Sequence, residues 1–259
     1  MVLLTPRHAR NGQSGRAAAL FALVLLSACA RPDAPAGIND PDEARNRIIH
    51  EDNVTLDRAV IRPVANAYGT VVPGPVRTGI DNFASNLGLP SAILNSLLQF
   101  RPGDAVKNTG RFVVNSTVGI GGLFDPASAM GLTEAEADFG ETLYVWGVPE
   151  GEYVEHPVLG PSTTRDSVGG LVDMVLDPLG FVNAASVARN AKASAGVIKV
   201  LNFRYESEGL IDSVLYDSAD SYAQSRQIYL DNRRFELGQG RDPTYFDPYE
   251  DPYDDPAFE

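Results

Sequence analysis

Residues Arg111 to Pro126 read Arg-Phe-Val-Val-Asn-Ser-Thr-Val-Gly-Ile-Gly-Gly-Leu-Phe-Asp-Pro. The segment has no charge between its two ends, and small or neutral polar residues lie among its bulky apolar ones. Glycine and serine remove bulk, so this mixture is typical of a buried segment that a backbone or a ligand approaches closely. As a helix, residues 112–124 would extend roughly 20 Å, which is short of a bilayer core of about 30 Å. The segment therefore cannot cross a bilayer as one helix, and a glycine-containing core of a soluble protein is the alternative interpretation.

The first 29 residues have the order of a secretory signal. Basic residues precede an apolar run at 17–26, and Leu26-Ser27-Ala28-Cys29 follows at once. That order predicts a signal peptide over residues 1–28. Leu-Ser-Ala-Cys resembles a bacterial lipobox, in which the cysteine becomes the acylated first residue of the mature protein. Cys29 is the only cysteine and has no intramolecular disulfide partner, and Ala30 after it favours delivery to the outer membrane.

The chain is acidic, with a formal net charge of −13, and its acids gather at the C-terminus. We expect residues 238–259 to form a disordered acidic tail, and residues 29–38 to form a Pro/Ala-rich linker. This charge balance argues against a nucleic-acid partner. It also provides no polybasic attraction to anionic lipid, so membrane attachment would depend on acyl chains and apolar area.

Apolar residues at helical spacing predict helices over much of residues 39–237. The first would start at Asp40–Glu43 with a capping box and be kinked or ended by Pro63. Two short helices would then flank Gly88-Leu89-Pro90, as either a re-entrant hairpin or a core helical hairpin, and the residues leave both open. Another helix would follow Asp104.

The second half of the chain predicts both helices and short extended pieces. We expect a helix to begin at Thr133–Ala137, extended pieces at Thr142–Gly147 and Tyr153–Val154, and a helix at Arg165–Leu176 that Asp177-Pro178 ends. A long helical region from Ala188 to Leu237 would weaken near Gly209.

No catalytic motif accompanies these elements. Only His50 and His156 remain after processing, and the chain lacks a Gly-x-Ser-x-Gly elbow, a His-Glu-x-x-His zinc motif and a phosphate-binding glycine fingerprint. Glu155 beside His156 is more often a surface pair than a catalytic dyad. We therefore predict that the protein is not an enzyme and uses no metal and no cofactor.

Several blocks of the sequence resemble the MlaA (VacJ) family of outer-membrane lipoproteins, from about residue 39 to residue 233. The most specific block is Asn115 to Asp125, preceded by Gly110-Arg111-Phe112. Further blocks, in order, are Asp40-Pro41, Arg62-Pro63-Val64-Ala65, Val72 to Arg77, Phe139 to Leu143, Trp146-Gly147-Val148, Leu159 to Thr163, Arg165-Asp166 and Ser221-Tyr222-Ala223. The charged loop Gly151–Pro157 departs from the more apolar loop expected of the family.

The resemblance implies a mainly α protein: a ring-like bundle of amphipathic helices embedded in one membrane leaflet, with a short extended hairpin-like segment. It implies phospholipid transport at the outer membrane. Phospholipids mislocalised in the outer leaflet would pass through an amphipathic channel to a soluble periplasmic phospholipid carrier, which would maintain lipid asymmetry. The protein would be anchored by acylated Cys29, face the periplasm and associate with a trimeric outer-membrane porin.

The opening segment is our candidate for the channel. A conduit for lipid headgroups needs neutral polar groups without fixed charges that would trap them. The expected lining or gating residues, with the two charged ones at the polar ends, are Arg111, Asn115, Ser116, Thr117, Gly119, Gly121, Gly122 and Asp125. Alternatively, the glycines only permit close helix packing.

Two other functions remain open from the sequence. A lipid-anchored envelope scaffold bound to a porin would also need Cys29 and an embedded body, and would move no lipid. An envelope hydrolase would require activity that is lost when His156 alone is changed.

Overall fold

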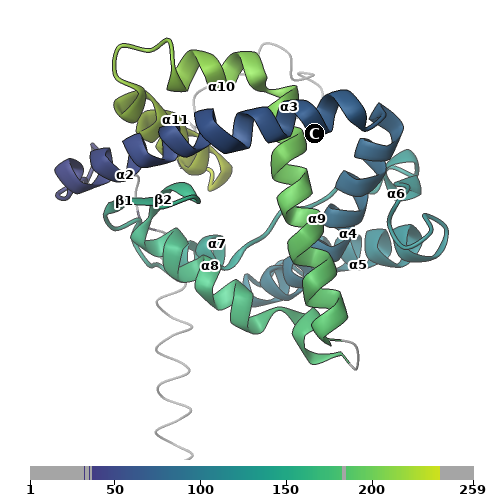
Figure 1. Cartoon of the computed structure of the whole chain (residues 1–259). Coiled ribbons are helices and arrows are strands. Elements are labelled where there is room, and N and C mark those ends of the chain that lie inside the picture. The colour runs from purple at the N-terminus through teal and green to yellow at the C-terminus, as the bar shows by residue number, and fades with distance from the viewer. Residues whose placement is uncertain (1–31, 33–34, 36, 183–184, 240–259) are drawn as a thin grey trace, which may run out of the picture.

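Helices make up most of the computed structural model, which describes residues 32, 35, 37–182 and 185–239 (Figure 1). In the first half they are α2 (Glu43–Leu56), the π-helix η1 (Asp57–Ile61), α3 (Arg62–Val71), α4 (Gly74–Leu98), α5 (Pro102–Thr117) and α6 (Pro126–Ala129). In the second half they are α7 (Phe139–Val145), α8 (Thr164–Leu176), the 3-10 helix η2 (Pro178–Phe181), α9 (Ala185–Glu206), α10 (Glu208–Leu215) and α11 (Ser221–Glu236).

One small antiparallel sheet accompanies the helices. Strands β1 (Tyr153–His156) and β2 (Gly160–Thr163) pair so that Tyr153 lies opposite Thr163. The predicted mainly α class with a short hairpin is therefore confirmed. The predicted signal peptide, Cys29 and the tail from residue 240 lie outside the described residues, and their roles stay predictions.

Packed pairs of elements close a ring-like circuit. The sheet contacts α2 through β1 and α8 through β2; α8 packs on α7, α7 on α4, α4 on both α5 and α9, and α9 on α3. The helix α2–η1–α3 then returns to the start. In Figure 1, α9 runs between α3 and the η2 end of the molecule, and the loop from α6 to α7 crosses behind it.

The first helices are longer than the sequence predicts. α2, η1 and α3 form one continuous helix, and the π turn comes directly before Pro63, where a wider turn accommodates the interrupted hydrogen-bond ladder. Helix α2 does begin at Glu43, but the Asp42 side chain makes no capping hydrogen bond. α4 continues through Pro90, so the expected break at Gly88-Leu89-Pro90 is wrong. Tertiary packing against α5 and α9 outweighs the roughly 3 kcal/mol that an interior proline costs.

Residues 132–138 form an irregular loop, and the helix predicted at Thr133–Ala137 is wrong. The side-chain amide of buried Asn108 pairs with both backbone groups of Ala135, as a neighbouring strand would. Its Nδ2 donates to the carbonyl of Ala135 at 2.7 Å, and its Oδ1 accepts from the Ala135 N–H at 3.1 Å. The helix begins instead at Phe139, capped by the Asp138 carboxylate.

Three further predictions are settled in the second half of the chain. Thr142–Val145 is part of α7 and not extended, because the α7 cap at Asp138 and its packing on α8 decide the backbone there. The helix at Arg165–Leu176 is confirmed, with Thr163 as its cap. The expected weak point near Gly209 is a break at Ser207 between α9 and α10, and a second break separates α10 from α11.

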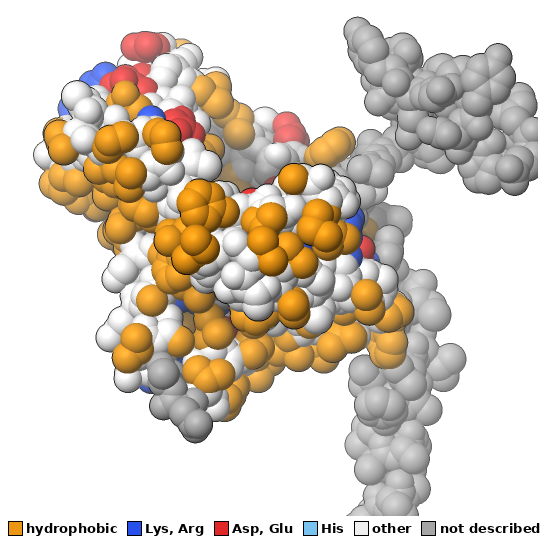
Figure 2. Space-filling view, turned by 90° about the vertical axis from the view of Figure 1, so that its right-hand side faces the viewer, with side chains coloured by type: hydrophobic (Ala, Val, Ile, Leu, Met, Phe, Trp, Pro, Cys, Tyr) orange, Lys and Arg blue, Asp and Glu red, His pale blue; other side chains and the backbone are white. Residues whose placement is uncertain are grey.

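The polarity of the described residues is inverted with respect to a water-soluble protein. Large apolar side chains project outward, and Figure 2 shows them over the face that carries α4, α5 and α6. The buried positions, in contrast, include His50, Asn95, Asn108, Arg111 and Glu155. A soluble globule would hide the apolar set and expose the polar one. Among the described residues, no helix combines the length and the apolar character that a membrane crossing requires.

Candidate functional site

A polar cavity of about 100 Å³ lies between α4, α5 and the loops on either side of α6. Its lining residues are Asn82, Ser85, Asn86, Leu89, Arg111, Asn115, Asp125 and Glu134. The residues from α4 follow the i, i+3, i+4, i+7 spacing of one helix face, and the two from α5 are four positions apart, so each set lies on one face. The two helices thus turn their polar faces toward one another.

Arg111 is the buried centre of this site. Its Nη2 donates to the Asp125 carboxylate at 3.1 Å, and its Nη1 donates to the Ser128 hydroxyl at 2.9 Å and to the carbonyl of Leu132. The Glu134 carboxylate lies farther away, 4.0 Å from Nη2. The Nε of Arg111 has no hydrogen-bond partner in the described structure.

Asp125 balances the charge of this arginine. Its Oδ1 accepts from Asn115 Nδ2 at 2.9 Å and from the Ser128 N–H, which caps α6. Burial alone would raise the pKa of Asp125, but the hydrogen bonds from Ser128, Asn115 and Arg111 outweigh it and lower the pKa to about 2. The Asp125 carboxylate therefore stays ionised at neutral pH.

The glycine-rich turn after α5 separates the polar interior from the apolar surface. The N–H of Gly122 donates to the carbonyl of Asn115 at 2.8 Å, and Gly122 has a φ of 95°, which favours glycine. A Cβ at this position would lie 2.5 Å from the Cβ of Asn86. The bulky side chains of the same turn, Val118 and Ile120, are exposed.

The structure brings part of the predicted set together. Arg111, Asn115 and Asp125 line the cavity, the Ser116 hydroxyl accepts from Asn86 Nδ2 at 3.0 Å, and Gly122 packs on Asn86. Arg111 and Asp125 are in contact, so they do not stand at separate ends of a conduit.

The remaining predicted residues do not line the cavity, although the carbonyl of Gly121 accepts from Asn86 Nδ2 at 3.5 Å. The Thr117 hydroxyl donates to the carbonyl of Val113 on its own helix. A Cβ at Gly121 would meet nothing within 4 Å, and one at Gly119 would lie 2.4 Å from the carbonyl oxygen of Phe124. The lining or gating role of the whole set stays a prediction.

Sequence reasoning missed the contribution of α4 and of the 132–138 loop. The signal was present on α4, where Asn82, Ser85 and Asn86 recur at helical spacing inside a mainly apolar segment. Glu134 gave no such signal, because it lies in a loop whose position only the fold determines.

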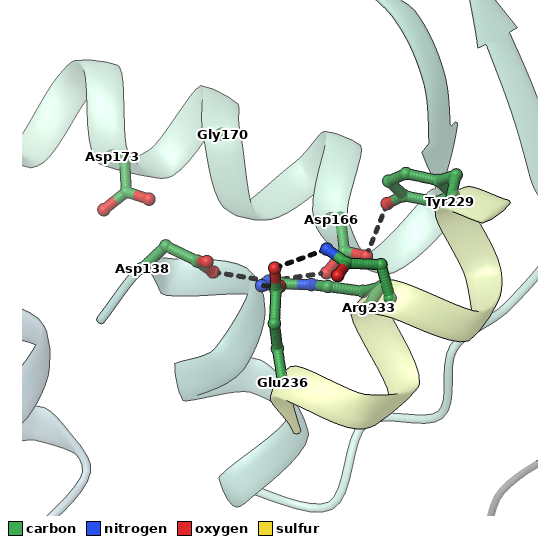
Figure 3. A pocket seen from close by; sticks show the side chains of 8 residues that line it. Asp138, Asp166, Gly170, Asp173, Tyr229, Arg233 and Glu236 are labelled. Carbon is green, nitrogen blue, oxygen red and sulfur yellow. Dashed lines mark hydrogen bonds and ion pairs between the residues drawn. The ribbon is translucent and has the colours of Figure 1, made fainter. Parts of the chain in front are cut away.

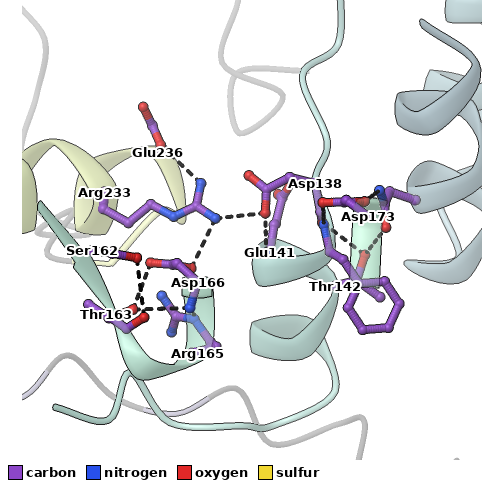
Figure 4. Close-up of polar contacts among 12 residues, drawn as sticks. Asp138, Glu141, Thr142, Ser162, Thr163, Arg165, Asp166, Asp173, Arg233 and Glu236 are labelled. Carbon is purple, nitrogen blue, oxygen red and sulfur yellow. Dashed lines mark hydrogen bonds and ion pairs between the residues drawn. The ribbon is translucent and has the colours of Figure 1, made fainter. Parts of the chain in front are cut away.

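A second polar cluster joins α7, α8 and α11 around a cavity of about 250 Å³ (Figure 3). Arg233 Nη2 donates to Asp138 at 2.7 Å and to Asp166 at 3.1 Å, and the Tyr229 hydroxyl donates to Asp166 at 2.8 Å. Burial would raise the pKa of Asp166, but Arg233 and Arg165 outweigh it and lower the pKa. Figure 4 shows these contacts continuing toward Asp173 across α7. The cluster therefore holds three helices together by charge.

Glu155 and His156 do not form the surface pair that the sequence favours, nor a catalytic dyad. Alternation along β1 buries Glu155, whose Oε1 lies 3.4 Å from Nδ1 of His50, while His156 Nε2 lies 2.7 Å from the Ser167 hydroxyl. Neighbouring side chains on a strand point to opposite faces, which separates the pair. Within residues 32, 35, 37–182 and 185–239, no group of three His, Cys, Asp or Glu residues is arranged to hold a metal ion.

Fold and site together define a class of mainly helical proteins with a polar interior and an apolar exterior. The chain belongs to the MlaA lipoprotein family, whose model matches residues 38–236. The family predicted from the sequence blocks is therefore confirmed.

The chain is similar to two curated relatives named intermembrane phospholipid transport system lipoprotein MlaA. Identity to the Escherichia coli (strain K12) protein is 32% over 229 residues, covering 86% of this chain and 88% of the relative. Identity to the Haemophilus influenzae protein is 29% over 238 residues, covering 86% and 90%. A solved structure described as "Structural basis for maintenance of bacterial outer membrane lipid asymmetry" matches with a TM-score of 0.65 and 33% identity, over 76% of this chain and 98% of that chain.

Proposed function

We propose that this protein removes mislocalised phospholipids from the outer leaflet of the outer membrane and passes them to a soluble periplasmic carrier. The observation that carries the proposal is the inverted polarity of the described fold. Apolar side chains outside suit contact with acyl chains, and the polar interior suits the passage of a headgroup. The names of its relatives, which it matches over most of their length, support the same role.

The same proposal places the protein in the envelope. Acylated Cys29 would anchor the protein to the outer membrane, so that the protein faces the periplasm. Its apolar surface would be embedded in one leaflet. The acyl chains on Cys29 and the apolar area of the body would both contribute to membrane binding. A trimeric porin is the proposed protein partner.

Deletion of the gene tests the proposal. Phospholipid in the outer leaflet, measured by labelling intact cells with a membrane-impermeant amine reagent, should rise in the deletion strain and return to normal with the wild-type gene. A strain expressing only Cys29→Ala should show a partial rise. No change in outer-leaflet phospholipid on deletion would favour the non-transporting scaffold instead.

A pair of glycine variants tests whether the turn next to the cavity takes part. Gly121 and Gly122 both have positive φ, so a β-branched residue strains the backbone at either position. Only Gly122→Val also pushes on Asn86, since a Cβ at Gly121 has open space around it. Gly122→Val should fail to complement the deletion at a protein level where Gly121→Val still complements. Equal complementation by the two variants at matched levels would count against a role for this turn.

A further inference from the structure

Lys199 on α9 places a positive charge at the rim of the polar cavity. Its Nζ donates to the hydroxyl of Ser85 at 2.8 Å, and Ser85 lines the cavity. No described carboxylate lies within ion-pair distance, 4.0 Å, of this ammonium group. The side chain is exposed, so Lys199 and Ser85 together leave donor capacity for an incoming anion.

Besides the unpartnered Nε of Arg111, the wall of the same cavity has two acceptors that receive no hydrogen bond, the Glu134 carboxylate and Oδ1 of Asn86. The side chain of Glu134 is only partly covered, and its nearest cation, Arg111, already donates to Asp125 at shorter distance. Asn86 is 3% exposed, and its Oδ1 has no hydrogen-bond partner among the described residues. A buried amide oxygen without a partner is costly, and a ligand that supplies N–H donors would remove that cost.

The rim at Lys199 and Ser85 is positively charged, and the wall at Glu134 beside it is negatively charged. Lys199 acts on the Glu134 carboxyl at a distance: burial raises the pKa of Glu134, and Arg111 and Lys199 oppose the rise. Inside the cavity, Asp125 and Glu134 outnumber Arg111, which leaves one uncompensated negative charge when both acids are ionised. The cavity volume of about 100 Å³ could hold several water molecules, and it is large enough for a small cationic group.

We infer that this cavity binds the headgroup of a zwitterionic aminophospholipid of the ethanolamine type. The phosphodiester would accept from Lys199 and Ser85, and the primary ammonium would donate to Glu134 and to Oδ1 of Asn86. This inference rests on the proposed transport of phospholipids and adds the headgroup that the polar interior prefers.

Other headgroups fit the arrangement less well. A choline ammonium has no N–H and leaves Asn86 without a donor. A glycerol headgroup brings no positive charge and leaves Glu134 uncompensated beside the lipid phosphate. Transport need not exclude these lipids, but retention should follow the order ethanolamine, then choline and glycerol.

Lipid retention by the full-length acylated protein tests the inference. The protein is purified in mild detergent, equilibrated with equimolar phosphatidylethanolamine, phosphatidylcholine and phosphatidylglycerol of identical acyl chains, and its bound lipid is quantified by mass spectrometry. Ethanolamine lipid should be enriched at least about tenfold, the ratio expected for a charge-assisted hydrogen bond. Equal retention of the three lipids would overturn the inference while leaving the proposed transport intact, which the deletion strain tests independently.

Two variants separate the halves of the site. Glu134→Gln should abolish the enrichment of ethanolamine lipid over glycerol lipid, with total bound lipid little changed. Lys199→Gln should reduce retention of all three lipids by roughly tenfold. The matched controls are Glu136→Gln, on the same loop, and Lys107→Gln, one turn before Arg111 on α5, because neither residue lines the cavity. Both variants should bind as the wild type does.

A fold check and a tail-free competitor complete the test. Circular-dichroism melts should show the same transition for all four variants, and loss of enrichment at Glu136 as well as at Glu134 would overturn the specific contact. Soluble glycerophosphoethanolamine carries the same phosphodiester and ammonium without tails, so it should displace the lipid only at a large excess. Displacement at equal concentration would identify a small metabolite as the ligand and overturn the lipid assignment.

Discussion

The pair Arg111 and Asp125 shows how one charged contact organises the polar interior. Arg111 is almost fully buried, and its guanidinium donates to Asp125, Ser128 and Leu132. A buried arginine without its carboxylate costs several kcal/mol, because the charge remains desolvated and uncompensated. The pair therefore fixes α5 to the start of α6 and sets the charge of the cavity wall.

We predict that Asp125→Asn destabilises the fold by about 2–4 kcal/mol at neutral pH, because Arg111 loses its nearest carboxylate. The loss should shrink on acidification. The pKa of Asp125 is lowered to about 2 from 3.8, so its contribution is present above about pH 4 and disappears as the pH falls toward 2. Thermal melts of both proteins between pH 7 and pH 2.5 would show the curves converging.

Asp220 provides the matched control. Its pKa is also lowered to about 2, by hydrogen bonds from Arg47 and from the N–H of Ala223, but this ion pair is exposed to solvent. Exposed pairs contribute less than about 1 kcal/mol, so Asp220→Asn should be nearly neutral. An equal loss of stability from the two substitutions would contradict the importance assigned to burial.

At the scale of the element, α7 and α8 cross at a contact that only glycine permits. A Cβ on Gly169 would lie 2.4 Å from the backbone nitrogen of Gly140, and backbone cannot give way as a flexible side chain can. Next along α8, Gly170 has nothing within 4 Å of its Cβ position. The ion pairs from Arg233 to Asp138 and Asp166 depend on this close crossing, because they join the same two helices to α11.

We predict that Gly169→Ala destabilises the protein by about 1–3 kcal/mol through overpacking and separates α7 from α8. Gly170→Ala should instead be neutral or stabilising by up to about 1 kcal/mol, since alanine has the higher helix propensity. Denaturant melts in detergent would measure both. Similar effects at the two positions would show that helix propensity, and not contact, governs this part of α8.

At the scale of the whole molecule, the apolar exterior should determine how the protein partitions between membrane and water. Leu171 lies on the face of α8 that also exposes Val168, Met174 and Val175. Ile48 on α2 is equally exposed, 63% against 64%, but stands among charged neighbours on that helix. Only the first position belongs to a continuous apolar face, as membrane-seated helices have.

We predict that Leu171→Glu, made together with Cys29→Ala to remove the proposed acyl anchor, moves the protein from phospholipid vesicles into the soluble fraction. A carboxylate placed among acyl chains costs about 3 kcal/mol, enough to shift partitioning by more than tenfold. Ile48→Glu in the same Cys29→Ala background should float with the vesicles as the parent does. If both variants floated equally, the apolar face of α8 would not be in contact with the lipid.

The sequence by itself determined the family, the helical class and several element boundaries, because these depend on local signals. The block Asn115 to Asp125, the start of α2 at Glu43 and the end of α8 at Asp177 were all visible in residue order. Local chemistry also predicted a polar role for Arg111 and Asp125.

Only the tertiary structure decided which polar groups meet. It carried α4 straight through Pro90, turned residues 132–138 into a loop held by Asn108, and placed Arg111 against Asp125 instead of at the opposite end of a conduit. Each outcome depends on contacts between residues distant in sequence, such as Asn86 with Ser116 and Lys199 with Ser85. Their free energy exceeds that of the local preferences, and no spacing along the chain encodes it.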